Sequence, residues 1–315
     1  MRKTLFFLFV TFLSITVSAQ KNDVYLFCYF IGNGQDGLHL AYSHDGLNWQ
    51  AMNDGKSYLV PQIGKDKLMR DPCIFQGPDG VFRMVWTSGW WDKGIGYSSS
   101  KDLITWSEQK NIPVMEKEPE AKNSWAPEVF YDARKKEYFI FWATTIPGRH
   151  SPIAYTEKEK DLNHRIYYVT TKDFNTFSDT KMFFNPSFSV IDATIIGKDK
   201  MFYMIVKNEN PNPPEKNLRV TKSDEAEGPY PVEVSAPITG NYWAEGPSAL
   251  QIGDYVYVYF DKYRNHQYGA VRSKDMVSWE DVSDQVSFPS GTRHGTAFKV
   301  SQEIFDKLIK YRTNN

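Results

Sequence analysis

Residues 43–49 read SHDGLNW, and similar stretches recur along the chain. The copies are SKDLITW at 100–106, TKDFNTF at 171–177 and SKDMVSW at 273–279, with a degenerate copy that begins at Lys222. The marker aspartates are Asp45, Asp102, Asp173, Asp224 and Asp275, at intervals of 57, 71, 51 and 51 residues. Self-similarity at such intervals predicts a fold built from repeated units of secondary structure.

A second series of motifs alternates with the first. Each motif opens an apolar strand, and the series is RDPCIF at 70–75, WAPEVF at 125–130, IDATI at 191–195, EGPSAL at 245–250 and RHGTAF at 293–298. The next apolar segments are rich in aromatic and β-branched residues, at 82–86, 138–142, 201–206 and 255–260. Turn residues such as PDG at 78–80 separate the two, so each pair predicts a β-hairpin.

The fifth unit is divided between the two ends of the chain. The motif at His294 has one strand after it, and residues 24–30 supply an orphan aromatic strand near the N-terminus. Joining them completes the unit and closes a ring, which removes the exposed sheet edges. The sequence therefore predicts an all-β fold, a five-bladed β-propeller whose last blade is closed by N- and C-terminal strands. Residues 20–315 form its single domain, and 301–315 are an amphipathic tail packed outside it.

Two rival architectures explain the sequence less well. A flat β-sandwich with a second domain does not account for a chain that begins with the missing half of its last unit. An α/β fold needs helical segments of about 10–15 residues between the strands, and these are missing from the pattern.

Composition and charge narrow the choice of partners. The 315 residues are 41% hydrophobic and 16% aromatic, which excludes a disordered tail protein. The chain has 37 Lys and Arg against 38 Asp and Glu, so it lacks the basic footprint of a nucleic-acid binder. We expect a monomer that binds neither nucleic acid nor membrane.

Residues 1–20 have the three parts of a secretory signal: a basic start, an apolar run and the sequence VSA before Gln20. The apolar run, 4–17, is shorter than the ~20 residues of a membrane-spanning helix. We therefore expect removal of residues 1–19 and export to the periplasm or the extracellular space.

The two cysteines, Cys28 and Cys73, are too few for a disulfide framework or a zinc site. They are interpreted as buried small residues, with a single disulfide left open.

Four of the five opening motifs carry a carboxylate: Asp71, Glu128, Asp192 and Glu245. First strands line the axis of a propeller, so we expect these groups to converge. Each alone could simply bond to nearby main-chain amides. Carboxylates and aromatics without a metal motif or a serine elbow suit glycoside hydrolysis, which needs one protonated and one ionised carboxyl. Indole rings at Trp125 and Trp243 could stack on sugars or pack between blades.

The order of these motifs resembles the five-bladed propeller enzymes of glycoside hydrolase family 43 over nearly the whole chain after the signal. The resemblance implies an inverting, exo-acting hydrolase of plant cell-wall side chains such as α-L-arabinofuranosides, β-xylosides, β-galactosides or galactofuranosides. It implies Asp71 as general base, Asp192 as the group that orients and tunes the acid, and Glu245 as general acid. Substrate-binding residues are predicted at Arg70, Trp90, Trp125, Glu128, Trp243, Arg293 and His294.

The resemblance implies an oligo- or polysaccharide substrate, and one feature of the sequence qualifies it. The RDP sequence at 70–72 is also similar to the fructan-cleaving propellers, where that aspartate binds substrate, so Asp36 remains a second candidate base. The resemblance implies that no cofactor is required. His294 matches a position that in some relatives lies beside a bound ion or water, so a structural ion or water is expected there.

We expect burial and the charge of Asp192 to raise the pKa of Glu245. The alternative functions are a carbohydrate-binding, lectin-like propeller without catalysis and a structural propeller.

Overall fold

The computed structural model describes residues 24–314, which hold 19 strands in five antiparallel sheets. The first blade contains β4 (Arg70–Gln76), β5 (Phe82–Thr87), β6 (Ile95–Ser100) and β7 (Lys110–Ile112). The second contains β8 (Trp125–Asp132), β9 (Glu137–Thr145), β10 (His164–Thr171) and β11 (Lys181–Phe184). The third contains β12 (Val190–Lys198), β13 (Met201–Asn208) and β14 (Asn217–Ser223).

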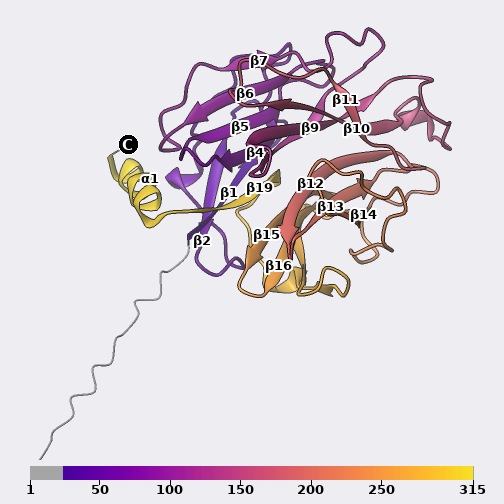
Figure 1. Cartoon of the computed structure of the whole chain (residues 1–315). Coiled ribbons are helices and arrows are strands. Elements are labelled where there is room, and N and C mark those ends of the chain that lie inside the picture. The colour runs from indigo at the N-terminus through magenta and orange to yellow at the C-terminus, as the bar shows by residue number, and fades with distance from the viewer. Residues whose placement is uncertain (1–23, 315) are drawn as a thin grey trace, which may run out of the picture.

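The last two blades complete the ring (Figure 1). The fourth contains β15 (Glu245–Ile252), β16 (Tyr255–Lys262), β17 (Gln267–Ser273) and β18 (Glu280–Asp281). The fifth joins β19 (Arg293–Val300) to β1 (Val24–Phe30), β2 (His39–Ser43) and β3 (Gln50–Ala51). Helix α1 (Gln302–Asn314) follows β19, and 3₁₀ turns occur at Asn53–Gly55, Glu157–Glu159 and Ser283–Gln285.

The inner strands contact one another in a closed cycle, which confirms the predicted propeller. Strand β4 contacts β8, β8 contacts β12, β12 contacts β15, β15 contacts β19, and β19 returns to β4. The closure is made by β1 and β19, whose register pairs Val24 with Val300 and Cys28 with Thr296. The fifth blade is therefore built from the two ends of the described chain, as the sequence predicted (Figure 1).

The repeated SxD stretch forms the turn between the third and fourth strands of a blade. In the turn after β2, Oδ1 of Asp45 accepts hydrogen bonds from the main-chain NH groups of Leu47 and Asn48, both 2.8 Å long. Asp102 and Asp275 make the same bonds, and the residue after each marker is left-handed, with φ of 73° at Gly46 and 63° at Leu103. The degenerate copy at Asp224 lies in the blade with three strands.

A β-bulge interrupts each inner strand near its start and turns the motif residues toward the axis. The register shifts between Arg70 and Cys73 in β4, and the equivalent shift occurs in β8, β12, β15 and β19. Left-handed residues mark four of these bulges: Asp71, Ala126, Asp192 and Gly246. Such conformations cost a non-glycine residue about 1–3 kcal/mol, and they concentrate at functional sites. The bulges thus place equivalent residues of different blades at one end of the channel.

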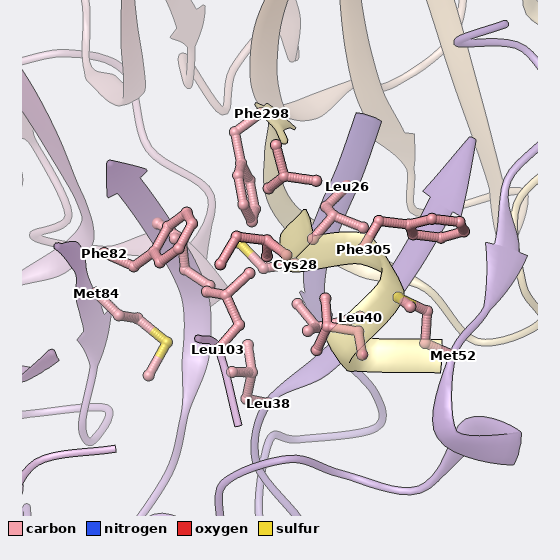
Figure 2. Close-up of a cluster of buried hydrophobic side chains, with 14 of the residues drawn as sticks. Leu26, Cys28, Leu38, Leu40, Met52, Phe82, Met84, Leu103, Phe298 and Phe305 are labelled. Carbon is pink, nitrogen blue, oxygen red and sulfur yellow. The ribbon is translucent and has the colours of Figure 1, made fainter. Parts of the chain in front are cut away.

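Apolar side chains fill the spaces between blades and beneath the helix. One cluster joins the fifth and first blades, where Leu26 and Cys28 of β1 face Phe82 and Met84 of β5 (Figure 2). Phe305 of α1 packs against the same cluster, so the amphipathic tail is an ordered helix outside the ring. Both cysteines are buried and free, and burial raises the pKa of the Cys28 thiol to about 12. An unreactive role as small core residues follows.

The signal sequence predicted for residues 1–19 lies outside the described residues. Within 24–314, no helix has both the length and the apolar character needed to cross a bilayer.

Candidate active site

A pocket of about 270 Å³ lies where the bulged inner strands meet. Its carboxylates are Asp71, Asp192, Glu209 and Glu245; its basic side chains are Arg70, Lys207, Arg293 and His294; and its aromatic rings are Trp90, Trp125 and Tyr263. The three carboxylates predicted to act together, on β4, β12 and β15, therefore line one cavity. Their convergence was the central expectation from the repeats.

Asp71 is held by two neighbours within the pocket. The hydroxyl of Thr87, at the end of β5, donates a hydrogen bond of 2.8 Å to Oδ2. Nδ1 of His294, on β19, lies 3.4 Å from Oδ1. Asp71 is thus fixed in orientation within the pocket.

Asp192 is buried and bonded to the neighbouring inner strand. Its Oδ2 accepts a hydrogen bond of 3.0 Å from the main-chain NH of Gly246. Burial raises the pKa of Asp192 to about 6, against the opposing effect of His294 and Lys207, while the negative charges of Glu245 and Asp71 add to the rise. Asp192 therefore changes its charge in the mildly acidic range.

Glu245 is clamped between two cations, one on each carboxylate oxygen. Nζ of Lys207 lies 3.1 Å from Oε2, and Nη2 of Arg293 lies 3.1 Å from Oε1. Burial acts to raise the pKa of Glu245, but the charges of Lys207 and Arg293 outweigh it, and the pKa lies below its ordinary value. The expectation of a raised pKa was wrong because the lysine comes from another blade's second strand, outside the motifs.

Each clamping cation has a second acidic partner. Nε of Arg293 lies 2.5 Å from Oδ2 of Asp261 at the end of β16, and burial raises the pKa of Asp261 to about 6. Nζ of Lys207 lies 2.7 Å from Oε2 of Glu209. The charges around Glu245 therefore form an alternating chain in which no cation belongs to Glu245 alone.

An aromatic wall forms the other side of the pocket. Nε1 of Trp125 donates a hydrogen bond of 2.7 Å to the carbonyl of Trp90, and the two rings lie 5.8 Å apart. The guanidinium of Arg70 lies 4.3 Å from the centre of the Trp90 ring and donates a hydrogen bond of 2.9 Å to Asn33 Oδ1. Trp90 is 39% exposed, so part of this wall is accessible from outside. Aromatic faces beside carboxylates suit the apolar faces of a sugar ring.

Of the predicted binding residues, Arg70, Trp90, Trp125, Arg293 and His294 line the pocket, and two do not. Glu128 is buried, its Oε1 has no hydrogen-bond partner among the described residues, and burial raises its pKa to about 8. Trp243 packs 5.8 Å from Tyr263, outside the lining. The second candidate base, Asp36, is also outside it, where its Oδ2 pairs with Nε2 of His39 at 2.9 Å.

Several residues that line the pocket or pair with its side chains were not found from the motifs. Thr87 and Lys207, which line the pocket, and Asp261, which pairs with Arg293, lie at the ends of the second strands of three blades. They pair with the residues that precede the bulges, Arg70, Ile191 and Glu245. A polar residue directly after a buried aromatic strand was the available signal. Glu209 and Tyr263 follow in the next loops and carry no motif.

No group of three or more His, Cys, Asp or Glu side chains in residues 24–314 is arranged to hold a metal ion. The ion or water expected near His294 remains a prediction, with Asp71 as the nearest acidic group.

The fold is a five-bladed β-propeller, and the carboxylates beside aromatic rings in its pocket are the groups that enzymes of glycoside hydrolysis use. The family model for a probable glycosyl hydrolase domain, related to glycoside hydrolase family 43, matches residues 21–306. The chain belongs to this family, in agreement with the resemblance seen in its motifs.

Individual relatives are more distant. The chain is 26% identical over 185 residues to an α-L-arabinofuranosidase of Bifidobacterium longum subsp. longum, a match that covers 53% of this chain and 17% of that enzyme. An α-L-arabinofuranosidase structure from Lactobacillus brevis has a TM-score of 0.52 at 17% identity, covering 68% of this chain and 72% of the other. A family 43 β-1,3-galactosidase bound to galactodeoxynojirimycin gives 0.53 at 14%, covering 71% and 79%. These structures share the fold.

Proposed function

We propose that the protein is an inverting, exo-acting glycoside hydrolase that removes single sugar units from the side chains of plant cell-wall polysaccharides. The observation that carries the proposal is the meeting of Asp71, Asp192 and Glu245, from three different blades, in one pocket. A propeller does not need acidic groups at this place for its stability, because burial of each carboxylate has a cost. Their convergence is therefore best explained by chemistry.

The roles follow from the surroundings of each group. Asp71, oriented by Thr87 and His294, removes a proton from a water molecule that attacks the anomeric carbon. Glu245 gives its proton to the departing glycosidic oxygen as the bond to that carbon breaks. The carboxylate of Asp192 accepts a hydrogen bond from the NH of Gly246 and so fixes the start of β15. Its negative charge also acts on the neighbouring Glu245. Inversion requires the base and acid carboxyls to stand ~6.5–9.5 Å apart, so that the water fits between base and sugar.

Pocket size supports attack at a chain end. Ligand sites typically occupy about 300–1,000 Å³, and a pocket of about 270 Å³ lies just below that range. It accommodates one sugar ring and not an extended polymer. The candidate glycones are α-L-arabinofuranose, β-xylose, β-galactose and galactofuranose. Similar proteins named as arabinofuranosidase and β-1,3-galactosidase support the first and the third of these.

A panel of aryl glycosides tests the proposal, with the anomer of the first product identified by NMR. We expect release of one of the four sugars with inverted configuration. Glu245→Gln should lose at least 100-fold in kcat/KM on a natural disaccharide and retain most activity on an aryl glycoside with a good leaving group, which needs little protonation. Asp71→Asn should lose activity on both.

Two outcomes would contradict the proposal. Binding of sugars by the wild-type protein without release of product would indicate the lectin-like alternative. A retained anomeric configuration would replace the inverting mechanism by one with a covalent intermediate.

Export is part of the proposal and depends on residues 1–19. Mass spectrometry of the protein recovered from the periplasm or medium should show a chain that begins near Gln20.

A further inference from the structure

Lys207 occupies an unusual position at the acid end of the pocket. It ends the apolar part of β13, its side chain is 2% exposed, and it faces the ring of Tyr263 at 4.8 Å. A lysine buried to this degree needs carboxylates to compensate the loss of water. Lys207 has two, with Nζ 2.7 Å from Glu209 Oε2 and 3.1 Å from Glu245 Oε2. Burial lowers the pKa of Lys207, but these two charges outweigh it, so the lysine stays protonated.

Glu209 in turn is shared between two buried lysines. Its Oε1 lies 2.7 Å from Nζ of Lys216, whose side chain is 1% exposed. Lys216 also pairs with Glu159 at 2.6 Å, in the 3₁₀ turn Glu157–Glu159. Lys207 is therefore held between a carboxylate with two cations of its own and the carboxylate of the proposed acid. The strength with which it acts on Glu245 depends on Glu209.

The other charges near Glu245 do not take over this role. Arg293 is divided between Glu245 and Asp261, as described above. The titratable and charged groups that face Glu245 are Lys207 on β13, Asp192 on β12, Asp71 on β4, Asp261 on β16, Arg293 and His294 on β19, and Glu209 and Tyr263 in the loops that follow β13 and β16. Arg293 also joins Glu245 to a carboxylate outside the proposed catalytic group, but its side chain is 33% exposed, whereas that of Lys207 is 2% exposed and its charge is less screened by solvent.

We propose that Lys207 is a positioning residue for the general acid: shared between Glu245 and Glu209, it sets the pH range in which Glu245 carries its proton. The inference rests on the proposed function. During cleavage, the proton on Glu245 passes to the departing oxygen as that oxygen takes the electrons of the broken bond, and Asp71 takes the proton of the attacking water. Lys207 exchanges no proton. Its charge stabilises the ionised form of Glu245 before and after this step.

Two substitutions change the pH profile in opposite directions. Lys207→Met removes a cation from Glu245, so the alkaline limb of kcat/KM, which reports the free enzyme's acid, should move up by about one pH unit. Glu209→Gln leaves Glu245 as the remaining carboxylate partner of Lys207, so the alkaline limb of kcat/KM should move to lower pH. Lys207→Arg keeps the charge and should stay near the wild-type profile. An effect on folding alone would not give shifts of opposite sign.

Lys216→Met is the matched control, because Lys216 is equally buried and contacts Glu209 without contacting Glu245. It should lower the unfolding temperature about as much as Lys207→Met and move the alkaline limb by less than half as far. On an aryl glycoside with a good leaving group, the alkaline limb should be absent in every variant. Should Lys207→Met fail to fold, the downward shift in Glu209→Gln still tests the inference.

These experiments distinguish a failure of the proposed function from a failure of the role of Lys207. Absence of sugar release by the wild-type protein would overturn the proposed function. An active wild-type protein whose alkaline limb stays in place in Glu209→Gln, or moves in the same direction in Glu209→Gln and Lys207→Met, would overturn the role of Lys207.

Discussion

Asp192 and Gly246 are joined across two neighbouring inner strands by a hydrogen bond of 3.0 Å from the glycine NH to the carboxylate. Both residues occupy bulges and have left-handed backbones, with φ of 52° and 61°. Because Gly246 directly follows Glu245, Asp192 fixes the main chain on which the proposed acid is carried. The same carboxylate also contributes charge beside Glu245.

Asp192→Asn separates these two contributions. The amide oxygen still accepts the bond from Gly246, so the unfolding free energy should change by less than about 1 kcal/mol. Loss of the negative charge stabilises the ionised form of Glu245, so the alkaline limb of kcat/KM should move to lower pH. At neutral pH, kcat/KM should fall by about 100-fold or more. Asp192→Ala, which also removes the acceptor, should unfold at a lower temperature than Asp192→Asn. A pH profile unchanged in Asp192→Asn would exclude the tuning role.

Gly246 itself is required for close packing at the axis. A Cβ at this position would overlap the imidazole of His294, and the left-handed backbone adds strain. Gly246→Ala should therefore cost about 1–3 kcal/mol of unfolding free energy and displace His294 from Asp71, with a loss of activity on every substrate. Gly253→Ala is the matched control: its φ is 57° and no atom lies within 4 Å of the added methyl group. It should cost about 1 kcal/mol and leave kcat/KM unchanged. Equal kinetic losses in both variants would contradict the steric argument.

The aromatic wall distinguishes two tryptophans that the sequence treated alike. Trp125 lines the pocket and is bonded to Trp90, whereas Trp243 lies against Tyr263 and Arg264. Trp125→Ala should raise KM about tenfold with a smaller change in kcat, because it removes a surface that binds the ground state and transition state alike. Trp243→Ala should change KM by less than threefold. Steady-state kinetics on the preferred aryl glycoside decide the matter, and the reverse order of effects would place the sugar nearer Trp243.

The repeats made the fold and the three carboxylates predictable. Each motif occupies the same place in its blade, so Asp71, Asp192 and Glu245 could be assigned to one end of the axis from their position alone. Glu128 differs from them in its place within the motif. Asp71 and Asp192 occupy bulges and Glu245 directly precedes one, whereas Glu128 follows the bulge residue Ala126 by two positions and pairs with Phe141 beyond the register shift. The WAPE motif predicted an acid in the pocket because its carboxylate lies further along the strand than the place of the motif in the blade indicates.

The electrostatics could not be predicted in this way. Burial raises the pKa of Glu245, but the charge of Lys207 is the largest effect that lowers it, and Lys207 belongs to a different blade and carries no repeated pattern. The register that brings Lys207 opposite Ile191 places it in the pocket, and a register is set by bulges and turns that short motifs do not specify. Charge partners across blades therefore had to be found from the structure.

The unfolding free energy should also depend on pH through the ionisation of Glu128. Burial raises the pKa of Glu128 from 4.5 to about 8 in the folded protein. A raised folded pKa means that the folded state holds this proton while the unfolded state loses it. The stabilisation is complete below about pH 4.5 and is lost as the pH rises through 8. At intermediate pH, the unfolding free energy should fall by up to about 1.4 kcal/mol per pH unit.

The difference in stability between the wild-type protein and Glu128→Gln isolates this group. Asp192 and Asp261, with pKa values raised to about 6, and His150 and His164, with pKa values that burial lowers to about 4 and about 3, change the slope in both proteins alike. Glu128→Gln stays neutral at every pH, so from pH 6.5 to 8 the unfolding free energy of the wild-type protein, measured by urea denaturation, should decline relative to that of Glu128→Gln. The two proteins should be closest in stability at low pH. Parallel declines in both would show that Glu128 is ionised in the folded protein throughout, in which case a cation or ordered water compensates it beneath the pocket.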